Sequence, residues 1–198
     1  MIKMYYNSSI PRNMLEIIMG CMFSGKSTEV IRRIKRLKTL KKNVMVINHS
    51  IDTRYTDGIQ GYIATHNRES EPCISTDKLY NLIETQTFRD AEVIIVEEAQ
   101  FFKDLFDFTT KSLDIFGKHV IISGLDGDSN REPFGEILRL IPHAEHVLKL
   151  SALCLECNDG TEAFFSKKLS TSKGDSQICV GAADKYIAVC RKHFNGTI

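Results

Sequence analysis

The chain of 198 residues lacks the features that define several large protein classes. No apolar run approaches the roughly 18 residues that a membrane-spanning helix needs. Residues 1–13 have no apolar core of the kind found in signal peptides, and they predict a polar, flexible N-terminal tail. The net charge is only +1, which argues against a chain-wide electrostatic grip on nucleic acid. We therefore expect a cytoplasmic protein that binds neither membranes nor nucleic acid.

The chain also shows no internal repeat, and its length suggests one domain or one domain with an appendage. A hydrophobic content of 42% is ordinary for a globular protein with a core. Six cysteines are present, and several of them lie close together in the sequence. In a reducing, intracellular setting, clustered cysteines are more often metal ligands than disulfide partners.

Residues 20–27 read GCMFSGKS and match the phosphate-binding loop pattern G-x-x-x-x-G-K-[ST]. Glycines let successive backbone N–H groups point at phosphate oxygens, and the helix that follows adds its positive end. Lys26 can reach the outer phosphates of a nucleotide, and the Ser27 hydroxyl can bind magnesium. An ordinary glycine turn is the alternative. The apolar strand pattern before the loop and the helical pattern after it favour phosphate binding.

Strand and helix patterns alternate over residues 15–150. We predict strands at 15–19, 43–48, 93–96, 119–123 and 146–150, and helices at 27–40, 76–87, 104–116 and 135–141, with Asp104 as an N-cap and Pro142 ending the last helix. Residues 50–72 read as a long loop. This alternation predicts an α/β fold over 14–150, a P-loop parallel sheet with helices on both faces. The pattern changes after Leu150, so residues 151–198 are predicted to form a smaller domain.

The predicted helix 27–40 and the residues just after it carry a dense basic run. Two interpretations are open. The run could contact nucleic acid, or it could be the solvated face of a helix. The second is more common, and the balanced overall charge favours it. The basic residues are Arg32, Arg33, Lys35, Arg36, Lys38, Lys41 and Lys42.

An acidic pair, Glu97-Glu98, follows the buried strand 93–96, where ligands bind in open α/β sheets. One carboxylate could support magnesium through water, and the other could accept a proton from a hydroxyl nucleophile. An exposed acidic turn is the alternative, and the nearby phosphate loop favours the functional interpretation. Two further loops, 52–55 and 123–128, also follow predicted strands, but each is a weak signal alone.

Cys154 and Cys157 form a C-x2-C pair, and Cys190 and His193 form a C-x2-H pair. Four such ligands complete a closed tetrahedral zinc site, which would be structural rather than catalytic. Two unrelated pairs of buried side chains are the alternative, and the spacing favours zinc. Nothing in the sequence makes Cys21, Cys73 or Cys179 a ligand.

Together these motifs resemble the zinc-containing cytosolic (type II) thymidine kinases over nearly all of residues 15–194. The matching pieces occur in the family's order and at its spacing, which makes the set far more specific than any one motif. They are Met22-Phe23-Ser24-Gly25-Lys26-Ser27-Thr28, Asp52-Thr53-Arg54-Tyr55, Glu98-Ala99-Gln100-Phe101-Phe102, Leu125-Asp126-Gly127, Arg131 with Pro133-Phe134-Gly135, and Ala183-Asp184-Lys185-Tyr186.

The resemblance implies transfer of the γ-phosphoryl group of ATP to the 5′-hydroxyl of thymidine, and of deoxyuridine, in the salvage pathway for DNA synthesis. It implies magnesium at Ser27, a structural zinc ion, a homotetramer, and Glu98 as the catalytic base facing the 5′-hydroxyl. The implied ATP-binding residues are Gly20, Cys21, Met22, Phe23, Ser24, Gly25, Lys26, Ser27, Asp52, Thr53, Arg54, Glu97, Glu98, Ala99 and Gln100. A lasso loop between the two zinc-ligand pairs would close over the nucleoside. The implied thymidine-binding residues are Met22, Phe101, Leu125, Ser129, Phe134, Ser166, Gln177, Ile178, Cys179, Val180, Gly181 and Tyr186.

Four positions depart from the family's pattern: Glu97 replaces Asp, Ser129 replaces Phe, Ala182 replaces Gly and Cys21 replaces Pro. The longer Glu97 moves the carboxylate outward by about one C–C bond, and the loss of an aromatic at 129 could loosen base selectivity. Two rival functions remain at this point. One is a zinc-containing nucleic-acid-binding P-loop ATPase, and the other is an inactive nucleotide-binding scaffold, which the intact Lys26 and Glu98 argue against.

Overall fold

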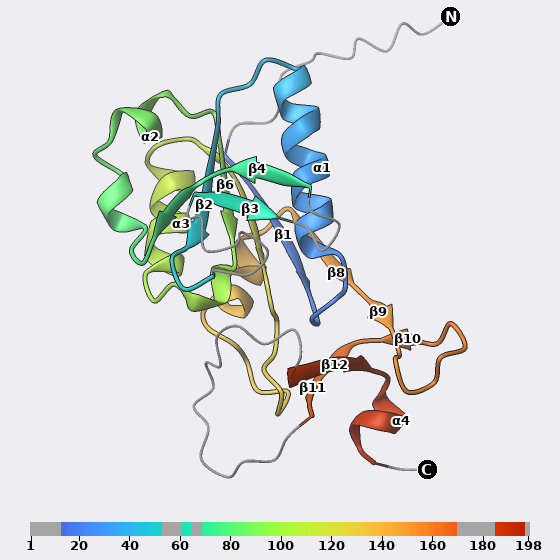
Figure 1. Cartoon of the computed structure of the whole chain (residues 1–198). Coiled ribbons are helices and arrows are strands. Elements are labelled where there is room, and N and C mark those ends of the chain that lie inside the picture. The colour runs from blue at the N-terminus through green and yellow to red at the C-terminus, as the bar shows by residue number, and fades with distance from the viewer. Residues whose placement is uncertain (1–12, 53–60, 65–68, 170–184, 197–198) are drawn as a thin grey trace, which may run out of the picture.

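The computed structural model describes residues 13–52, 61–64, 69–169 and 185–196 (Figure 1). Most of the predicted tail lies outside this part of the chain, and so do several predicted site residues. These are Thr53 and Arg54 of the ATP site, and Gln177, Ile178, Cys179, Val180 and Gly181 of the nucleoside site.

A six-stranded, entirely parallel sheet forms the centre of the molecule, in the order β5-β2-β6-β7-β1-β8 (Figure 1). Long apolar stretches make its inner strands buried on both faces, as parallel sheets require. The predicted parallel α/β sheet is therefore confirmed. The strands are β1 (Met14–Gly20), β2 (Val44–His49), β5 (Ile74–Thr76), β6 (Val93–Glu97), β7 (His119–Gly124) and β8 (His146–Leu150).

Helices cover both faces of this sheet (Figure 1). On one face, α1 (Lys26–Thr39) buries Ile31 and Ile34 against Ile18 of β1. On the other face, Ile17 shares a core with α2 (Gln86–Asp90), α3 (Leu105–Asp114) and the 3-10 helix η3 (Ile137–His143). Successive strand residues thus enter different cores. In the described part of the chain, no helix has both the length and the apolar character needed to cross a membrane.

Two expected elements differ from the structure between the second and third predicted strands. The predicted helix 76–87 is wrong, because β5 is followed by a 3-10 turn, η1 (Tyr80–Leu82), and then by α2. The Thr85 hydroxyl accepts a hydrogen bond from the Phe88 N–H at 3.2 Å, so it caps a new helix instead of continuing an old one. The expected loop 50–72 contains a hairpin of β3 (Tyr62–Ala64) and β4 (Ser70–Pro72).

One predicted cap contact and one predicted helix boundary also need correction. Asp104 precedes α3 as predicted, but its carboxylate accepts from the Tyr80 N–H at 3.0 Å and caps no N–H of its own helix. The helix expected at 135–141 begins two residues later and extends past Pro142 as η3. Gly135 has a left-handed backbone (φ 64°), which cannot start a right-handed helix.

The C-terminal module, residues 151–169 and 185–196, lies at the sheet end that carries the phosphate loop (Figure 1). Its elements are β9 (Ala152–Leu153), β10 (Glu162–Ala163), β11 (Phe165–Lys168), β12 (Tyr186–Val189) and α4 (Arg191–Phe194). The pairs β9–β10 and β11–β12 are antiparallel. Cys21 of the phosphate loop belongs to the module's small core, so the two regions share buried surface. The domain boundary at residue 150 stays a prediction.

Candidate active site and metal centre

The phosphate loop connects the end of β1 to the start of α1, as the motif predicted. Two glycines give the loop its shape. A Cβ atom on Gly20 would lie 2.4 Å from the Leu150 carbonyl oxygen, and Gly25 has a left-handed backbone (φ 82°). The Lys26 ammonium donates to the Cys21 carbonyl at 2.8 Å, which holds its charge over the loop. The first turn of α1 therefore presents a cation and backbone N–H groups where a phosphate can bind.

Glu97, the last residue of β6, lies against the first turn of α1. The Ser27 hydroxyl donates to one of its carboxylate oxygens, while the other oxygen is buried and has no hydrogen-bond partner among the described residues. Burial raises the pKa of the Glu97 carboxyl, which the nearby hydroxyls of Ser123 and Ser27 and the charge of Lys26 only partly oppose. The site is thus an electronegative corner with one unsatisfied oxygen.

A second carboxylate near Glu97 comes from Asp52, which follows β2. Asp52 raises the pKa of Glu97 through its negative charge, and its own carboxylate accepts from the Asn48 side-chain amide at 3.1 Å. Asn48 is 3% exposed at the end of β2 and was missed by sequence reasoning. A buried polar residue at the carboxyl end of an apolar strand was the signal that could have identified it. Carboxylate and hydroxyl oxygens are ligands that magnesium prefers, so the residues present fit that ion.

Glu98 follows directly and is held differently. Its backbone is left-handed (φ 52°), an uncommon and strained conformation for a residue with a side chain. Its carboxylate accepts a hydrogen bond from the Gln100 side-chain amide nitrogen, and the side-chain oxygen of the same Gln100 accepts from the Leu125 N–H at 3.0 Å. Both Glu98 and Gln100 are buried, at 7% and 3% exposure. The strain and the partner fix the direction of a buried carboxylate, as a base must be fixed to act on one hydroxyl.

The structure brings together several residues predicted to bind the nucleoside. Phe101, at the end of the 3-10 helix η2 (Ala99–Phe101), meets the Phe134 ring edge-on with centroids 5.5 Å apart. The Met22 N–H donates to the Ser166 hydroxyl at 2.9 Å, which joins the phosphate loop to β11. Of the other described residues predicted to bind the nucleoside, Leu125 and Ser129 are half-buried after β7, and Tyr186 is half-buried at the start of β12.

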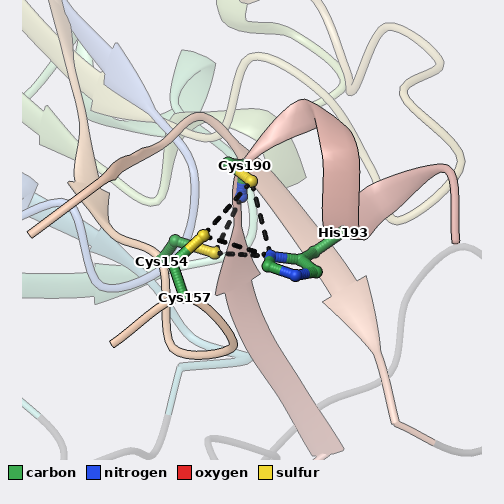
Figure 2. Close-up of side chains that lie close together, drawn as sticks. All are labelled: Cys154, Cys157, Cys190 and His193. Carbon is green, nitrogen blue, oxygen red and sulfur yellow. Dashed lines mark hydrogen bonds between the residues drawn. The ribbon is translucent and has the colours of Figure 1, made fainter. Parts of the chain in front are cut away.

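The four predicted zinc ligands converge in the C-terminal module (Figure 2). The His193 Nδ1 atom lies 3.4, 3.2 and 3.5 Å from the sulfur atoms of Cys154, Cys157 and Cys190, and the last two sulfurs are 3.8 Å apart. Usual Zn–S and Zn–N bonds predict tetrahedral edges of about 3.6 Å for S–N and about 3.8 Å for S–S. The cluster therefore has the size and donor set to hold zinc.

A phosphate loop at a helix N-terminus, a strand-end carboxylate beside it and a second, oriented carboxylate define a P-loop nucleotide-binding protein equipped for phosphoryl transfer. A family model described as "Thymidine kinase" matches residues 13–194. The chain belongs to the thymidine kinase family, which confirms the resemblance and the predicted enzyme class.

Individual relatives agree with this assignment. The chain is 40% identical to thymidine kinase 1 of Dictyostelium discoideum over 182 residues, covering 91% of this chain and 77% of that protein. It is 40% identical to the human cytosolic thymidine kinase over 180 residues, covering 91% and 72%. It is 41% identical to the thymidine kinase of Raccoon poxvirus over 179 residues, covering 90% and 94%.

Proposed function

We propose that this protein transfers the γ-phosphoryl group of ATP to the 5′-hydroxyl of thymidine and gives thymidine monophosphate. The observation that carries the proposal is the position of Glu98 in a member of this family. It follows β6, and the preceding residue, Glu97, contacts the first turn of α1. A base and a phosphate-binding loop therefore lie at the same carboxyl end of the sheet's strands, where the hydroxyl and the transferred group must meet.

Each residue has a distinct part in this reaction. The loop N–H groups and Lys26 hold the ATP phosphates, and Glu98 accepts the proton of the 5′-hydroxyl as the oxygen attacks the γ-phosphorus. Ser27 and Glu97 would hold magnesium, which neutralises charge on the phosphates when bound. Thr53 and Arg54 lie outside the described residues, so their predicted contacts with ATP remain part of the proposal.

The nucleoside would bind against the aromatic wall formed by Phe101 and Phe134. Met22 and Leu125 supply apolar surface suited to the thymine methyl group, and Ser166 ties this surface to the C-terminal module. Deoxyuridine, which lacks only that methyl group, is expected to be accepted as well. Residues 177–181, which carry the predicted contacts with the thymine edge, lie outside the described part of the chain.

Zinc in the C-terminal cluster would be structural, because all four ligands come from the protein and leave no open position. Its role would be to fix the two strands that flank residues 170–184. Elemental analysis should give about one zinc per chain, and Cys154→Ser should lower both the zinc content and the melting temperature. Unchanged zinc content in that variant would contradict the assignment.

A nucleic-acid-binding ATPase is not favoured, because acidic residues neutralise much of the basic run on α1. Lys35 pairs with Glu69 at 2.8 Å, Lys38 with Glu71 at 2.5 Å, and Lys42 with Glu92 at 2.7 Å. Glu71 lies in β4, and Glu69 directly precedes that strand. The run is thus a solvated, ion-paired helix face, as the more common interpretation predicted.

Assembly into a homotetramer, and action in the cytosol, extend this proposal. The edge strand β8 exposes Val147 and Leu148 beside an open row of backbone groups, a surface suited to contact between copies. Analytical ultracentrifugation should give a mass of about four chains. A monomer at micromolar concentration would contradict the tetramer and leave the activity untouched.

The first test is phosphate transfer from labelled ATP, with magnesium, to thymidine, deoxyuridine, deoxycytidine and deoxyguanosine. We expect strong transfer to the first two and little to the others. Transfer to all four would keep the kinase but show that Ser129 has broadened the pocket. No transfer to any would refute the proposed activity, and ATP hydrolysis stimulated by DNA would support the rival.

A further inference from the structure

The bridging loop, residues 127–134, leaves the main sheet after β7 and reaches the C-terminal module (Figure 1). Gly127 and Pro133 pair as an antiparallel bridge at its base. The Asp128 carboxylate accepts from the backbone N–H groups of Asn130 and Glu132 at 2.8 and 2.9 Å. These contacts make the loop a compact, self-bonded turn with Arg131 at its tip.

Arg131 contacts the C-terminal module through aromatic rings. Its guanidinium carbon lies 4.5 Å from the centre of the Phe194 ring and 5.7 Å from that of Phe165. The two rings are themselves packed together, with centroids 5.4 Å apart. Within the described part of the chain, Arg131 forms no ion pair, so these rings are the contacts through which its charge acts.

Each ring belongs to a residue that is adjacent in sequence to a residue of the metal centre or of the proposed nucleoside pocket. Phe194 directly follows the zinc-ligand position His193, and Phe165 directly precedes Ser166, whose hydroxyl accepts the Met22 N–H of the phosphate loop. At the other end of the bridging loop, Phe134 packs against Phe101. Arg131 therefore contacts residues that are adjacent in sequence to the metal centre and to the phosphate-loop contact, and its own loop leads to Phe134.

Two features indicate that this tip contact positions the loop. An open pocket of about 180 Å³ lies between the bridging loop, Phe165 and Lys149, so the loop is not closely packed against the rest of the molecule there. The Arg131 backbone is left-handed (φ 67°), a conformation that persists only when surrounding contacts hold it.

We propose that Arg131 is a positioning residue that couples the metal centre to the nucleoside pocket, because its guanidinium holds the bridging loop, and with it Phe134 and Ser129, against Phe194 and Phe165. This inference rests on the proposed placement of thymidine along that loop. The contacts of Lys26 and of Ser27 with Glu97 do not involve Arg131, so ATP binding should depend on Arg131 much less than nucleoside binding does. Loosening of the bridging loop should weaken nucleoside binding selectively.

The test is steady-state kinetics of Arg131→Met and Arg131→Lys, with thymidine and ATP varied in turn. We expect the Met variant to raise the thymidine KM about tenfold, equivalent to ~1.4 kcal/mol, with the ATP KM within about twofold of the original. The Lys variant should fall between, because it keeps the charge over the rings but loses the planar stack. Zinc content should be unchanged in both variants.

Arg139→Met is the matched control. Arg139 lies on η3, and its guanidinium carbon is 4.3 Å from the centre of the Phe106 ring. This is the same kind of contact, but it lies outside the bridging loop and the C-terminal module. It should leave the thymidine KM unchanged. A double variant of Arg131→Met with Phe194→Leu should be no worse than the more impaired single variant, because both remove the same contact.

Two results would overturn the inference. One is an unchanged thymidine KM in Arg131→Met. The other is a rise of both KM values together with a fall in zinc content and melting temperature, which would make Arg131 a general structural residue. A wild-type protein that phosphorylates thymidine while the variants behave in either way refutes only this inference. A wild-type protein without activity on thymidine refutes the proposed function itself.

Discussion

Two glutamates, the buried Glu97 and the half-buried Glu16, lie on the α1 face of the same sheet, at its opposite ends. Glu97 ends β6 beside the phosphate loop, and Glu16 lies near the start of β1. Both oxygens of Glu16 have charged or polar partners, since one accepts from Arg33 and the other lies 2.8 Å from the His119 Nε2 atom. One oxygen of Glu97 has no partner among the described residues.

The pKa shifts of the two carboxyls have opposite directions for this reason. Burial raises the pKa of each, but at Glu16 the hydrogen bond from His119 and the charge of Arg33 outweigh burial and lower it overall. At Glu97 no ion pair forms with any of the described residues, and the pKa stays raised. Protein side chains thus compensate the charge of Glu16 at one end of the sheet, whereas the charge of Glu97 at the other end is left for a bound ligand to compensate.

Glu98→Gln tests the ligand-binding end with the largest expected effect. The amide keeps the size of the side chain and removes its ability to accept a proton, so kcat should fall by about 10² to 10⁴. The KM values for ATP and thymidine should change little, because the loop and pocket contacts remain.

Glu16→Gln is the matched control for that measurement. It is the same substitution of a largely buried glutamate on the same sheet, but at the end without the phosphate loop. Its kcat should remain near that of the original protein. Near-normal turnover in Glu98→Gln would remove Glu98 from the reaction, and equal losses in both variants would erase the difference between the two ends.

Glu97→Gln should stabilise the metal-free protein but weaken its binding of magnesium. In the metal-free protein at neutral pH, the amide removes the cost of a buried carboxylate, so the melting temperature should rise by about 2–4 °C. The magnesium concentration needed for half-maximal activity should rise roughly tenfold, as is typical when a group supporting a metal is lost.

The pH dependence of stability should also distinguish this variant from the original protein. Because the folded-state pKa of Glu97 lies above the ordinary value of 4.5, folding binds extra protons between those two values. The stability of the metal-free original protein should therefore fall as pH rises through that window, and the variant should lack this fall. Calorimetry without magnesium measures it. A destabilised variant with an unchanged magnesium requirement would make Glu97 a structural residue like Glu16.

Local patterns were enough to predict the ligand-binding end of the sheet from sequence. The phosphate loop and the acid pair 97–98 are contiguous motifs, and the two zinc-ligand pairs are spaced as knuckles, so each is visible without a fold. The cluster in Figure 2 confirms that the two pairs meet.

The opposite end could not be predicted in this way. Glu16 meets His119 only because β1 and β7 pair in the register that places Met14 opposite His119, across 103 residues of chain. Arg33 reaches Glu16 only because of how α1 packs on β1. The helix expected at 76–87 failed for a related reason. Its apolar spacing is real, but Leu79 and Leu82 are buried by a turn and Phe88 by a second, separately capped helix.

The smallest expected effect is the loss of folding stability caused by Glu16→Gln. The lowered pKa of Glu16 means that its contribution is present above the unfolded-state value of 4.5 and is lost as pH falls through the folded-state value. Because Glu16 and its partner Arg33 are partly solvent-exposed, the variant should lose only about 1 kcal/mol at pH 7 in urea unfolding. The difference from the original protein should shrink toward zero in acid, where the carboxylate takes up its proton. A difference that stays constant across pH would mean that Glu16 acts through packing rather than charge, and the contrast with Glu97 would then rest on the unpaired oxygen alone.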